Sequence, residues 1–421
     1  MIENIDKYKF VILTGCSYGV IFRETFSDIR YHRTNNVPKN FKSSENVIVI
    51  NVACQSMGAG WQCDSIIYTI NKLKKLGVSS KNIYSYIQFS EIRRLTWPVN
   101  SYFWKNSPKL YPHFRFGERF SFKINELGES FHPEEGFEHE DGVLSLINKE
   151  LNIKGTQKAR DKPVLPITFI DDMAYICPDQ VSLDDIDNTY GIKIGTMYRN
   201  YKEIEQSMPM EAKILHYFNY ILKLQYFLKS ENIKYNCCFI YNQLSGWRIE
   251  DKILKKSDCH HIFGKWYDGL KFNPQKLKEF LPQHDLINQF PQIKPLYNQI
   301  DWSKFWMYNK NDIRNGGIDE YIIDNFGVGA FCDVFQGKIL KIDEAEYTNH
   351  PNRFLYCTIW NESAKDCDFL KVSDSYLKEI EERYWEDWNN QGDEITLNNI
   401  TVSKKKFCDN HNCDYFNNKL I

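Results

Sequence analysis

A serine flanked by glycines follows the first apolar segment of the chain. The stretch Val11–Phe22 reads VILTGCSYGVIF, in which Gly15, Ser17 and Gly19 spell G-x-S-x-G. A serine hydroxyl attacks an acyl carbon only when a base takes its proton and hydrogen-bond donors stabilise the resulting oxyanion. Ser17 is therefore a candidate nucleophile that depends on residues elsewhere in the chain. The alternative is a strand-to-helix turn in which the Ser17 hydroxyl caps the helix.

The spelling of this motif identifies no enzyme class by itself. The nucleophile elbow of α/β-hydrolases lies after several strands and takes one oxyanion donor from an upstream loop. Only one predicted strand precedes Ser17, so the elbow interpretation fails on position. A phosphate-binding loop requires Gly-Lys-Ser/Thr, and no such tripeptide follows. Residues further along the chain must decide what Ser17 does.

The composition narrows the class of protein. Hydrophobic residues make up 42% of the 421 residues and charged residues 26%, which is typical of a globular chain. The 53 basic and 55 acidic residues nearly cancel, so no general electrostatic attraction to nucleic acid or to a membrane surface is expected. The acidic start and the lack of a long apolar run predict a soluble protein without a signal peptide. The 12 cysteines are scattered, which favours free thiols in a reducing compartment.

Alternating strand and helix patterns predict an α/β layer fold with a parallel sheet. Two segments, Cys63–Leu76 and Met210–Ser230, have apolar residues at helical spacing. Gly77, which follows the first segment, is its predicted C-cap. Short apolar runs predict four buried strands, at Phe10–Thr14, Val47–Asn51, Ile83–Phe89 and Tyr235–Tyr241.

Two long segments interrupt this alternation. Trp97–Ser207 is rich in proline, glycine, aromatic and charged residues, and Gly246–Gln299 is punctuated by prolines. We interpret both as insertions, at the sheet edge where loops carry function. A late helix is predicted at Leu377–Trp388, followed by a polar tail.

Four separated sequence blocks resemble the SGNH (GDSL-like) hydrolases, and most closely the divergent SGNH-like proteins of bacteriophages. These blocks are LTGCSYG, VINVACQSMGAGW, YIQFSEIRRL and NHPN, and GGIDEY at Gly316–Tyr321 is similar to the phage-type segment before the last block. The resemblance covers about the sheet-forming half of the chain and rests on the order of the blocks rather than on any one of them.

The resemblance implies a role for one or two residues of each block. Ser17 takes the nucleophile position and His350 the general-base position. Asn51 ends the second strand, and Gly58 stands where the family offers a backbone N–H to the oxyanion. The third block of the family supplies a further donor, which here corresponds to Gln88 or Ser90, and it also contains Arg93.

The chain departs from the family pattern in two places. The family has Asp two or three residues before its histidine to orient the imidazole, and this chain has Thr348 and Tyr347 there. Glu346 is the substitute carboxylate that we assign to the site, with Asp343 as a neighbour, and a Ser–His dyad or an inactive site remain as alternatives. Ser90 replaces the family's longer Asn donor, and losing one good donor costs about two to three orders of magnitude in rate.

Structural roles compete with each functional assignment. Gly58 could serve only to permit positive φ, and Gln88 and Ser90 could be a polar strand end. His350 could be a surface residue before a turn-forming proline. An ion pair of Arg93 or Arg94 with Glu91 or another carboxylate is favoured over binding of an anionic substrate.

No metal or other cofactor is predicted. Cys408, His411 and Cys413 stand at short spacing, as do the residues from Asp258 to His261, but each group provides only half of a four-ligand zinc site. The aromatic residues of the insertions could stack on sugar rings, although the core of an insertion or an interface is the more common use.

The sequence thus predicts a three-layer α/β/α fold with a flavodoxin-like parallel sheet and two insertions. The predicted function is an SGNH-like serine esterase acting on acyl, plausibly acetyl, esters of carbohydrate. The rival is a catalytically degenerate virion protein of a phage that uses the same scaffold to bind other virion proteins. Either would lie in the cytoplasm of a host cell or in a phage virion, without a nucleic-acid or membrane partner. The predicted core comprises residues 1–96, 208–245 and 300–390, with insertions at 97–207 and 246–299 and a tail at 391–421.

Overall fold

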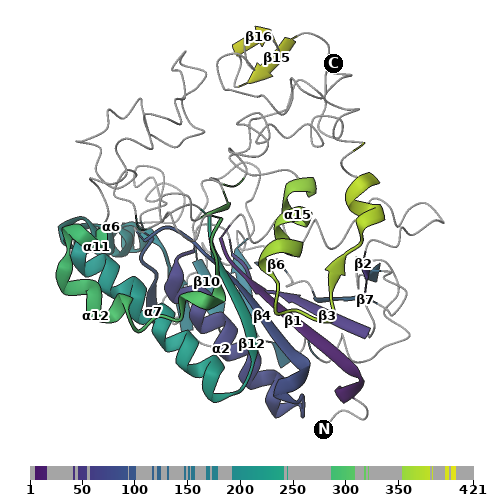
Figure 1. Cartoon of the computed structure of the whole chain (residues 1–421). Helices are drawn as coiled ribbons and strands as arrows, with labels where there is room; N and C mark the ends of the chain where they lie inside the picture. The colour runs from purple at the N-terminus through teal and green to yellow at the C-terminus, as the bar shows by residue number, and fades with distance from the viewer. Residues whose placement is uncertain are drawn as a thin grey trace. The chain divides into compact units, whose positions relative to one another are not determined.

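The fold was determined from a computed structural model of the whole chain (Figure 1). The residues that it describes are 5–16, 41–42, 46–54, 57–92, 94–100, 116–117, 121–124, 130–131, 147, 150–151, 153–156, 167–170, 173–178, 192–240, 244, 286–308, 317–318, 321, 353–379, 382, 394–397 and 400–403. They fall into two compact units, one made of residues 1–237, 293–305 and 364–371, and the other of residues 238–292, 306–363 and 372–421.

A seven-stranded sheet with the order β13-β12-β4-β1-β3-β7-β8 is the centre of the fold (Figure 1). The strands β1/β3 and β1/β4 pair in parallel, and the five strands from β13 to β3 form the parallel part. A hairpin of β7 and β8 extends the sheet antiparallel to β3. The bounds are Tyr8–Thr14 for β1, Asn46–Asn51 for β3, Ile83–Phe89 for β4, Ser121–Ile124 for β7, Ser130–Phe131 for β8, Lys234–Phe239 for β12 and Phe305–Trp306 for β13.

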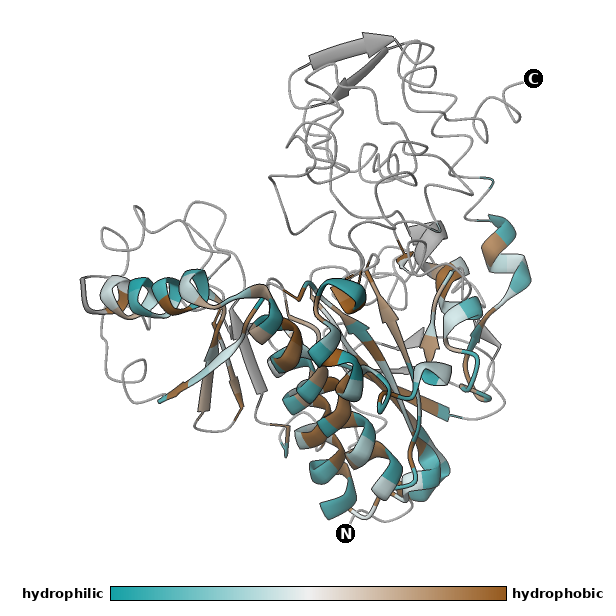
Figure 2. Cartoon of the chain, turned by 60° about the vertical axis from the view of Figure 1, so that its left-hand side comes forward, coloured by the Kyte–Doolittle hydropathy of each residue, from teal (hydrophilic) through white to brown (hydrophobic). Residues whose placement is uncertain are grey.

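The apolar runs of the sequence form these strands because they are buried on both faces. All seven residues of β4 are buried, as are six of the seven of β1. The helices α2 (Ala59–Lys75) and α7 (Met210–Ser230) pack against each other, and α2 lies against β1 and β4. Both helices carry hydrophobic and hydrophilic residues, as expected for one buried and one exposed face (Figure 2). The α/β class with a parallel sheet and flanking helices is therefore confirmed.

The predicted end of the first helix is confirmed. Leu76 is the C-cap of α2, and Gly77 follows at φ 100°, a left-handed conformation that glycine adopts without strain. The N–H of Val78 donates to Leu73 O at 3.0 Å and that of Gly77 to Lys74 O at 3.0 Å. These are the two hydrogen bonds of a Schellman motif, which satisfy carbonyls at the end of the helix.

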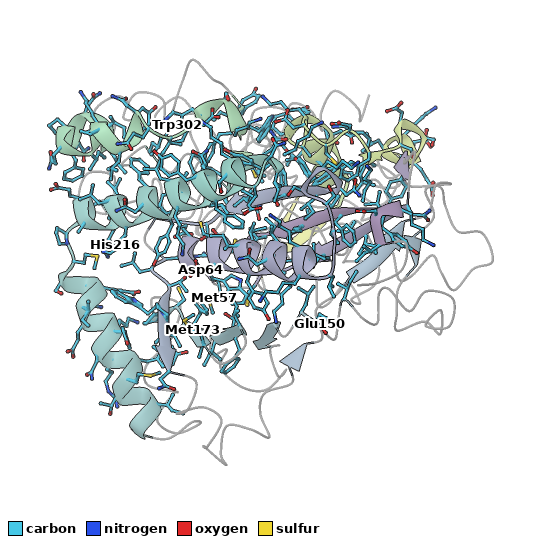
Figure 3. All side chains as sticks on the ribbon, turned by 90° about the horizontal axis from the view of Figure 1, so that it is seen from below. Met57, Asp64, Glu150, Met173, His216 and Trp302 are labelled. Atoms are coloured by element: carbon cyan, nitrogen blue, oxygen red, sulfur yellow. The ribbon has the colours of Figure 1, made fainter. Side chains whose placement is uncertain are left out.

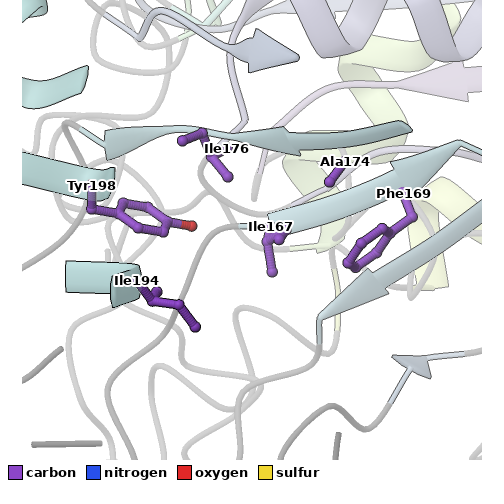
Figure 4. Close-up of a cluster of buried hydrophobic side chains, with 6 residues drawn as sticks. All are labelled: Ile167, Phe169, Ala174, Ile176, Ile194 and Tyr198. Carbon is purple, nitrogen blue, oxygen red and sulfur yellow. The ribbon is translucent and has the colours of Figure 1, made fainter. Parts of the chain in front are cut away.

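The segment that we predicted to be the first insertion contains a second sheet. Its five strands have the order β5-β11-β10-β9-β6, and the pairs β5/β11, β11/β10, β10/β9 and β9/β6 are antiparallel. The helix α6 (Ile192–Ser207) shares a hydrophobic cluster with it (Figure 4), formed by Ile167, Phe169, Ala174, Ile176, Ile194 and Tyr198. The strand bounds are Trp97–Asn100 for β5, Phe116–Gly117 for β6, Ile153–Thr156 for β9, Ile167–Ile170 for β10 and Met173–Ile176 for β11.

Short elements complete the described residues. In the first unit, the bidentate Gln225 side chain of α7 holds the backbone of Asp301, with its Nε2 donating to Asp301 O at 3.1 Å and its Oε1 accepting from Asp301 N at 2.9 Å.

In the second unit, β15 and β16 form an antiparallel pair. Residues 374–379 and 382 are helical and overlap the predicted late helix. The remaining bounds are Ile5–Lys7 for η1, Phe41–Lys42 for β2, Ser80–Asn82 for η2, Leu286–Gln289 for α11, Pro291–Ile293 for η9, Lys294–Tyr297 for α12, Trp302–Lys304 for η10, Arg353–Ser363 for α15, Lys371–Val372 for β14, Glu394–Leu397 for β15 and Ile400–Ser403 for β16.

None of the helices in the described ranges has the length and apolar character needed to cross a bilayer.

Candidate functional site

The carboxyl ends of β1 and β3 continue as a paired backbone beyond the strands. Val52 N donates to Leu13 O at 2.7 Å, and Cys54 N donates to Gly15 O at 3.0 Å. Cys16 is fully buried at the end of this extension. Ser17 is the next residue along the chain and lies outside the described residues. The ladder therefore fixes the backbone that leads directly to Ser17.

The strand order places this extension at a reversal of the sheet. The chain passes from β1 to β3 on one side, and then returns to β4 on the other side of β1. In open α/β sheets, ligands bind outside the carboxyl ends of the strands at such a reversal. The expected position of a ligand is therefore beside the ends of β1 and β4.

Two polar side chains at the end of β4 are buried without a hydrogen-bond partner among the described residues. Gln88 and Ser90 are each 0% exposed. Neither the Nε2 and Oε1 atoms of Gln88 nor the Oγ of Ser90 has a partner in this part of the chain. Because an unpaired buried amide or hydroxyl costs about 1–3 kcal/mol, these groups are candidates for contact with a ligand.

Gln62, in the first turn of α2, joins the end of β4 to the start of that helix. Its Oε1 accepts from Ser90 N at 3.2 Å, and its own backbone N–H donates to Gly58 O at 3.2 Å. On the other side, Tyr217 of α7 donates its hydroxyl to Ser90 O at 2.8 Å. The backbone of Ser90 is thus held through both its N–H and its carbonyl, while its side-chain oxygen has no partner in the described chain.

Gly58 is the N-cap residue of α2, and its surroundings explain why it is glycine. Its φ is −96°, so the alternative that glycine is needed here for positive φ is wrong. A Cβ at this position would lie 1.7 Å from Arg94 O, and only glycine allows that approach. The Gly58 N–H donates to Thr96 Oγ1 at 2.9 Å. In this structure the predicted oxyanion donor is therefore bonded to the Thr96 hydroxyl.

Asn51 stabilises the turn after β3. Its Oδ1 accepts from Ala53 N at 2.9 Å, and the residue is 7% exposed. This short-range bond is of the kind by which Asn side chains mimic a backbone turn. The position of Asn51 at the strand end is as predicted, and its part in substrate binding stays a prediction.

Of the two arginines in the third block, Arg94 has a structural partner. Its guanidinium donates to Glu91 Oε1 at 3.1 Å, as the ion-pair alternative predicts. Arg93 lies outside the described residues, as do the predicted catalytic residues His350 and Glu346.

The structure therefore brings four of the predicted site residues, Asn51, Gly58, Gln88 and Ser90, to the carboxyl edge of one sheet. Sequence reasoning missed the residues that connect them, Gln62, Thr96 and Tyr217. A polar Gln62 in an otherwise apolar start of a helix was the one available signal. Within the ranges that the structure describes, no group of three or more His, Cys, Asp or Glu side chains could hold a metal ion. The half-sites at 258–261 and 408–413 lie outside those ranges.

A polar cluster beside the site anchors the second sheet to α2. Tyr175 of β11 donates its hydroxyl to Asp64 Oδ2 at 3.2 Å, and Lys223 of α7 forms an ion pair with the same carboxylate. Burial, together with the Asp64 charge, raises the pKa values of Tyr175 and Tyr220. Figure 3 labels Asp64, and Met173 at the start of β11. Both phenols remain protonated near neutral pH, so neither acts as a base, and Tyr175 donates its hydroxyl proton to Asp64.

Cys63, next to Asp64, is not a candidate nucleophile. It is fully buried, and its thiol donates to Tyr220 O at 3.2 Å. Burial raises the pKa of this thiol, with Asp64 adding to the shift. Because the thiolate is the reactive form, a raised pKa makes the thiol inert.

Comparisons of this chain with models of protein families, with curated proteins and with solved structures found no match.

Proposed function

We propose that the protein is a serine ester hydrolase of the SGNH kind, with a three-layer α/β/α, flavodoxin-like core. The observation that supports this most is the pair of buried polar groups on Gln88 and Ser90, which have no hydrogen-bond partner among the described residues. Both residues stand at the end of β4, the neighbour of β1 in the sheet. The backbone that continues β1 is paired with that of β3 and leads to Ser17. The order β3-β1-β4-β12-β13 corresponds to the 2-1-3-4-5 order of flavodoxin-like sheets.

The proposed reaction is a two-step acyl transfer. Ser17 Oγ attacks the acyl carbon of the ester, and His350 takes the hydroxyl proton and passes it to the alcohol that leaves. His350 then removes a proton from water, which attacks the acyl-enzyme and releases the carboxylic acid and Ser17. Hydrogen-bond donors at the strand ends stabilise the oxyanion in both steps. The substrate is an ester, and the carbohydrate acetyl ester remains the proposal that the resemblance suggests.

Hydrolysis of p-nitrophenyl acetate by purified protein tests this function. The Ser17→Ala variant should lose the turnover of the wild type, and a fluorophosphonate probe should label wild type but not this variant. Ser207→Ala is the matched control, because Ser207 is exposed on α6 and its hydroxyl donates within that helix, to Ile204 O. Equal rates for wild type and Ser17→Ala would sink the proposal.

Two observations favour the second candidate function, a structural protein of a phage particle on the same scaffold. The Gly58 N–H is bonded to Thr96, and Ser90 is shorter than the donor of the family pattern. A binding protein needs no oxyanion donors, so these two features would be harmless to it. Immunodetection of the chain in purified particles, without fluorophosphonate labelling, supports this candidate. A monomer absent from particles counts against it.

A further inference from the structure

We propose that the Thr96 hydroxyl is an oxyanion donor in this protein, in the place that the family pattern gives to the Gly58 N–H. This inference rests on the proposed esterase function and names a residue of that site. It starts from the hydrogen bond of 2.9 Å that Gly58 N–H donates to Thr96 Oγ1. Thr96 is 4% exposed, so water does not compete for its hydroxyl.

Within the described part of the chain, the Thr96 hydroxyl accepts a hydrogen bond but donates none. A threonine hydroxyl has one O–H donor and two acceptor lone pairs. The Gly58 N–H uses one lone pair. Among the described residues, no acceptor receives the Thr96 O–H. A buried donor in this situation is complementary to an oxygen atom that arrives with a ligand.

The backbone around Thr96 is fixed on both sides. Residues 94–96 press against the start of α2, because a Cβ on Gly58 would meet Arg94 O at 1.7 Å and one on Gly60 would meet Thr96 O at 3.3 Å. On the other side, Trp97 begins β5 and pairs with Ile176 of β11. A donor held in this way needs no reorganisation during the reaction, which is the condition under which such donors contribute most.

Thr96 belongs to the same set of hydrogen bonds as the end of β4. It is bonded to Gly58, whose carbonyl oxygen accepts from Gln62 N, and the Gln62 side chain accepts from Ser90 N. The Ser90 hydroxyl, which lies at the end of this series, has no partner in the described chain. Thr96 and Ser90 therefore supply two hydroxyl groups around the start of one helix whose O–H has no acceptor among the described residues.

The bond from Gly58 strengthens Thr96 as a donor. A hydroxyl that accepts a hydrogen bond becomes polarised, and its own donated bond is strengthened. The bond comes from an N–H at the amino end of α2, where the helix dipole is positive. Through this bond, the positive end of the helix dipole favours negative charge on the atom that accepts the Thr96 O–H.

The test compares Thr96→Val with Thr96→Ser in hydrolysis of p-nitrophenyl acetate, with rates normalised to the active sites counted by fluorophosphonate labelling carried to completion. Valine keeps the shape of the side chain and removes the hydroxyl. We expect kcat to fall about 100-fold with KM within about 2-fold, since the bond is made to the oxyanion rather than to the ground state. Serine should restore kcat to within about 5-fold of wild type, because it restores the donor.

Thr69→Val is the matched control. Thr69 lies on α2 and is buried, as Thr96 is, and its hydroxyl donates to Ser65 O at 2.7 Å within the helix. Its kcat should stay at the wild-type value. An unchanged or raised kcat for Thr96→Val overturns this inference, and a raised value identifies Thr96 as a group that blocks Gly58. Equal rates for wild type and Ser17→Ala overturn the proposed esterase and this inference with it, whereas loss in Ser17→Ala with full activity in Thr96→Val overturns this inference alone.

Discussion

The Tyr84 hydroxyl donates to Asn236 Oδ1 at 2.8 Å and so joins two neighbouring strands, β4 and β12, through fully buried side chains. Asn236 also bonds twice to Asp366, whose N–H donates to Oδ1 at 3.0 Å and whose Oδ2 accepts from Nδ2 at 3.2 Å. Lys304 donates to the same carboxylate oxygen at 2.9 Å. Burial raises the pKa of Tyr84, so its hydroxyl remains a donor at neutral pH.

Removing Asn236 should therefore cost more than removing its Tyr84 partner. Asn236→Leu removes the acceptor of the Tyr84 hydroxyl and of the Asp366 N–H, and one of the two donors to Asp366 Oδ2, and we expect a loss of about 3–5 kcal/mol in the free energy of unfolding. Tyr84→Phe removes one donor while Asn236 Oδ1 still accepts from Asp366, and should cost about 1–2 kcal/mol. Urea denaturation of both variants measures these losses. Equal losses would contradict the central position of Asn236.

Gly58→Ala should destabilise the protein through a backbone clash. Its Cβ would fall 1.7 Å from Arg94 O, which cannot move without displacing residues 94–96. We expect a loss of at least about 2 kcal/mol, at the upper end of the usual cost of overpacking. Gly60→Ala is the milder comparison, because its Cβ would meet Tyr220 side-chain atoms at 3.1 and 3.2 Å and Thr96 O at 3.3 Å, all far longer than the 1.7 Å contact at Gly58. Thermal melts of the two variants should differ clearly, and similar melting temperatures would contradict the clash.

Gln88→Met should stabilise the protein. The Gln88 amide is buried and has no partner in the described chain, so an apolar side chain of similar length removes a desolvation cost. We expect a gain of about 1–2 kcal/mol in the free energy of unfolding, together with a loss of esterase turnover.

Gln225→Met is the control for this effect. Gln225 is also buried, but both ends of its amide are bonded to the backbone of Asp301. Its replacement should cost about 2–3 kcal/mol, because two backbone groups lose their partner. Chemical denaturation of the two variants should give shifts of opposite sign. A destabilised Gln88→Met would show that the amide has a structural partner.

Cys367 should contribute to a loss of stability at alkaline pH. Burial raises the pKa of its thiol from 9.0 to about 12. The folded state thus keeps a proton that the unfolded chain releases above pH 9, and stability falls as pH rises from about 9 to about 12, by up to about 1.4 kcal/mol per pH unit for this one group. Cys367→Ala should reduce this slope in guanidinium titrations at pH 8.5, 9.5 and 10.5. An unchanged slope would contradict a buried neutral thiol.

The parallel strands could be predicted from sequence because local pattern and tertiary burial agree there. The predicted β4 and α7 have the observed bounds, and β1 and β3 begin only two residues and one residue earlier than predicted. The helix predicted at Cys63–Leu76 begins earlier in the structure, at Ala59. The prediction missed this first turn because Ala59 and Gly60 are small residues packed under other segments and are not members of an amphipathic repeat. Glycine there reports close approach, which periodicity does not detect.

The second sheet could not be predicted because its pairing is non-local. Its strands are four residues or fewer, and β5 pairs with β11 rather than with the strand that follows it in sequence. In the site, positions at strand ends could be predicted for Asn51, Gln88 and Ser90, since the ends of parallel strands meet at one edge. The bond from Gly58 to Thr96 could not, because it depends on how residues 94–96 fold back onto α2.

The helix α2 is attached both to the end of β4 and to the second sheet. Its first turn holds Ser90 through Gln62, and two residues further on Asp64 receives the hydroxyl of Tyr175. Both bonds are made within one turn of α2, so the end of β4 and the second sheet share one rigid support.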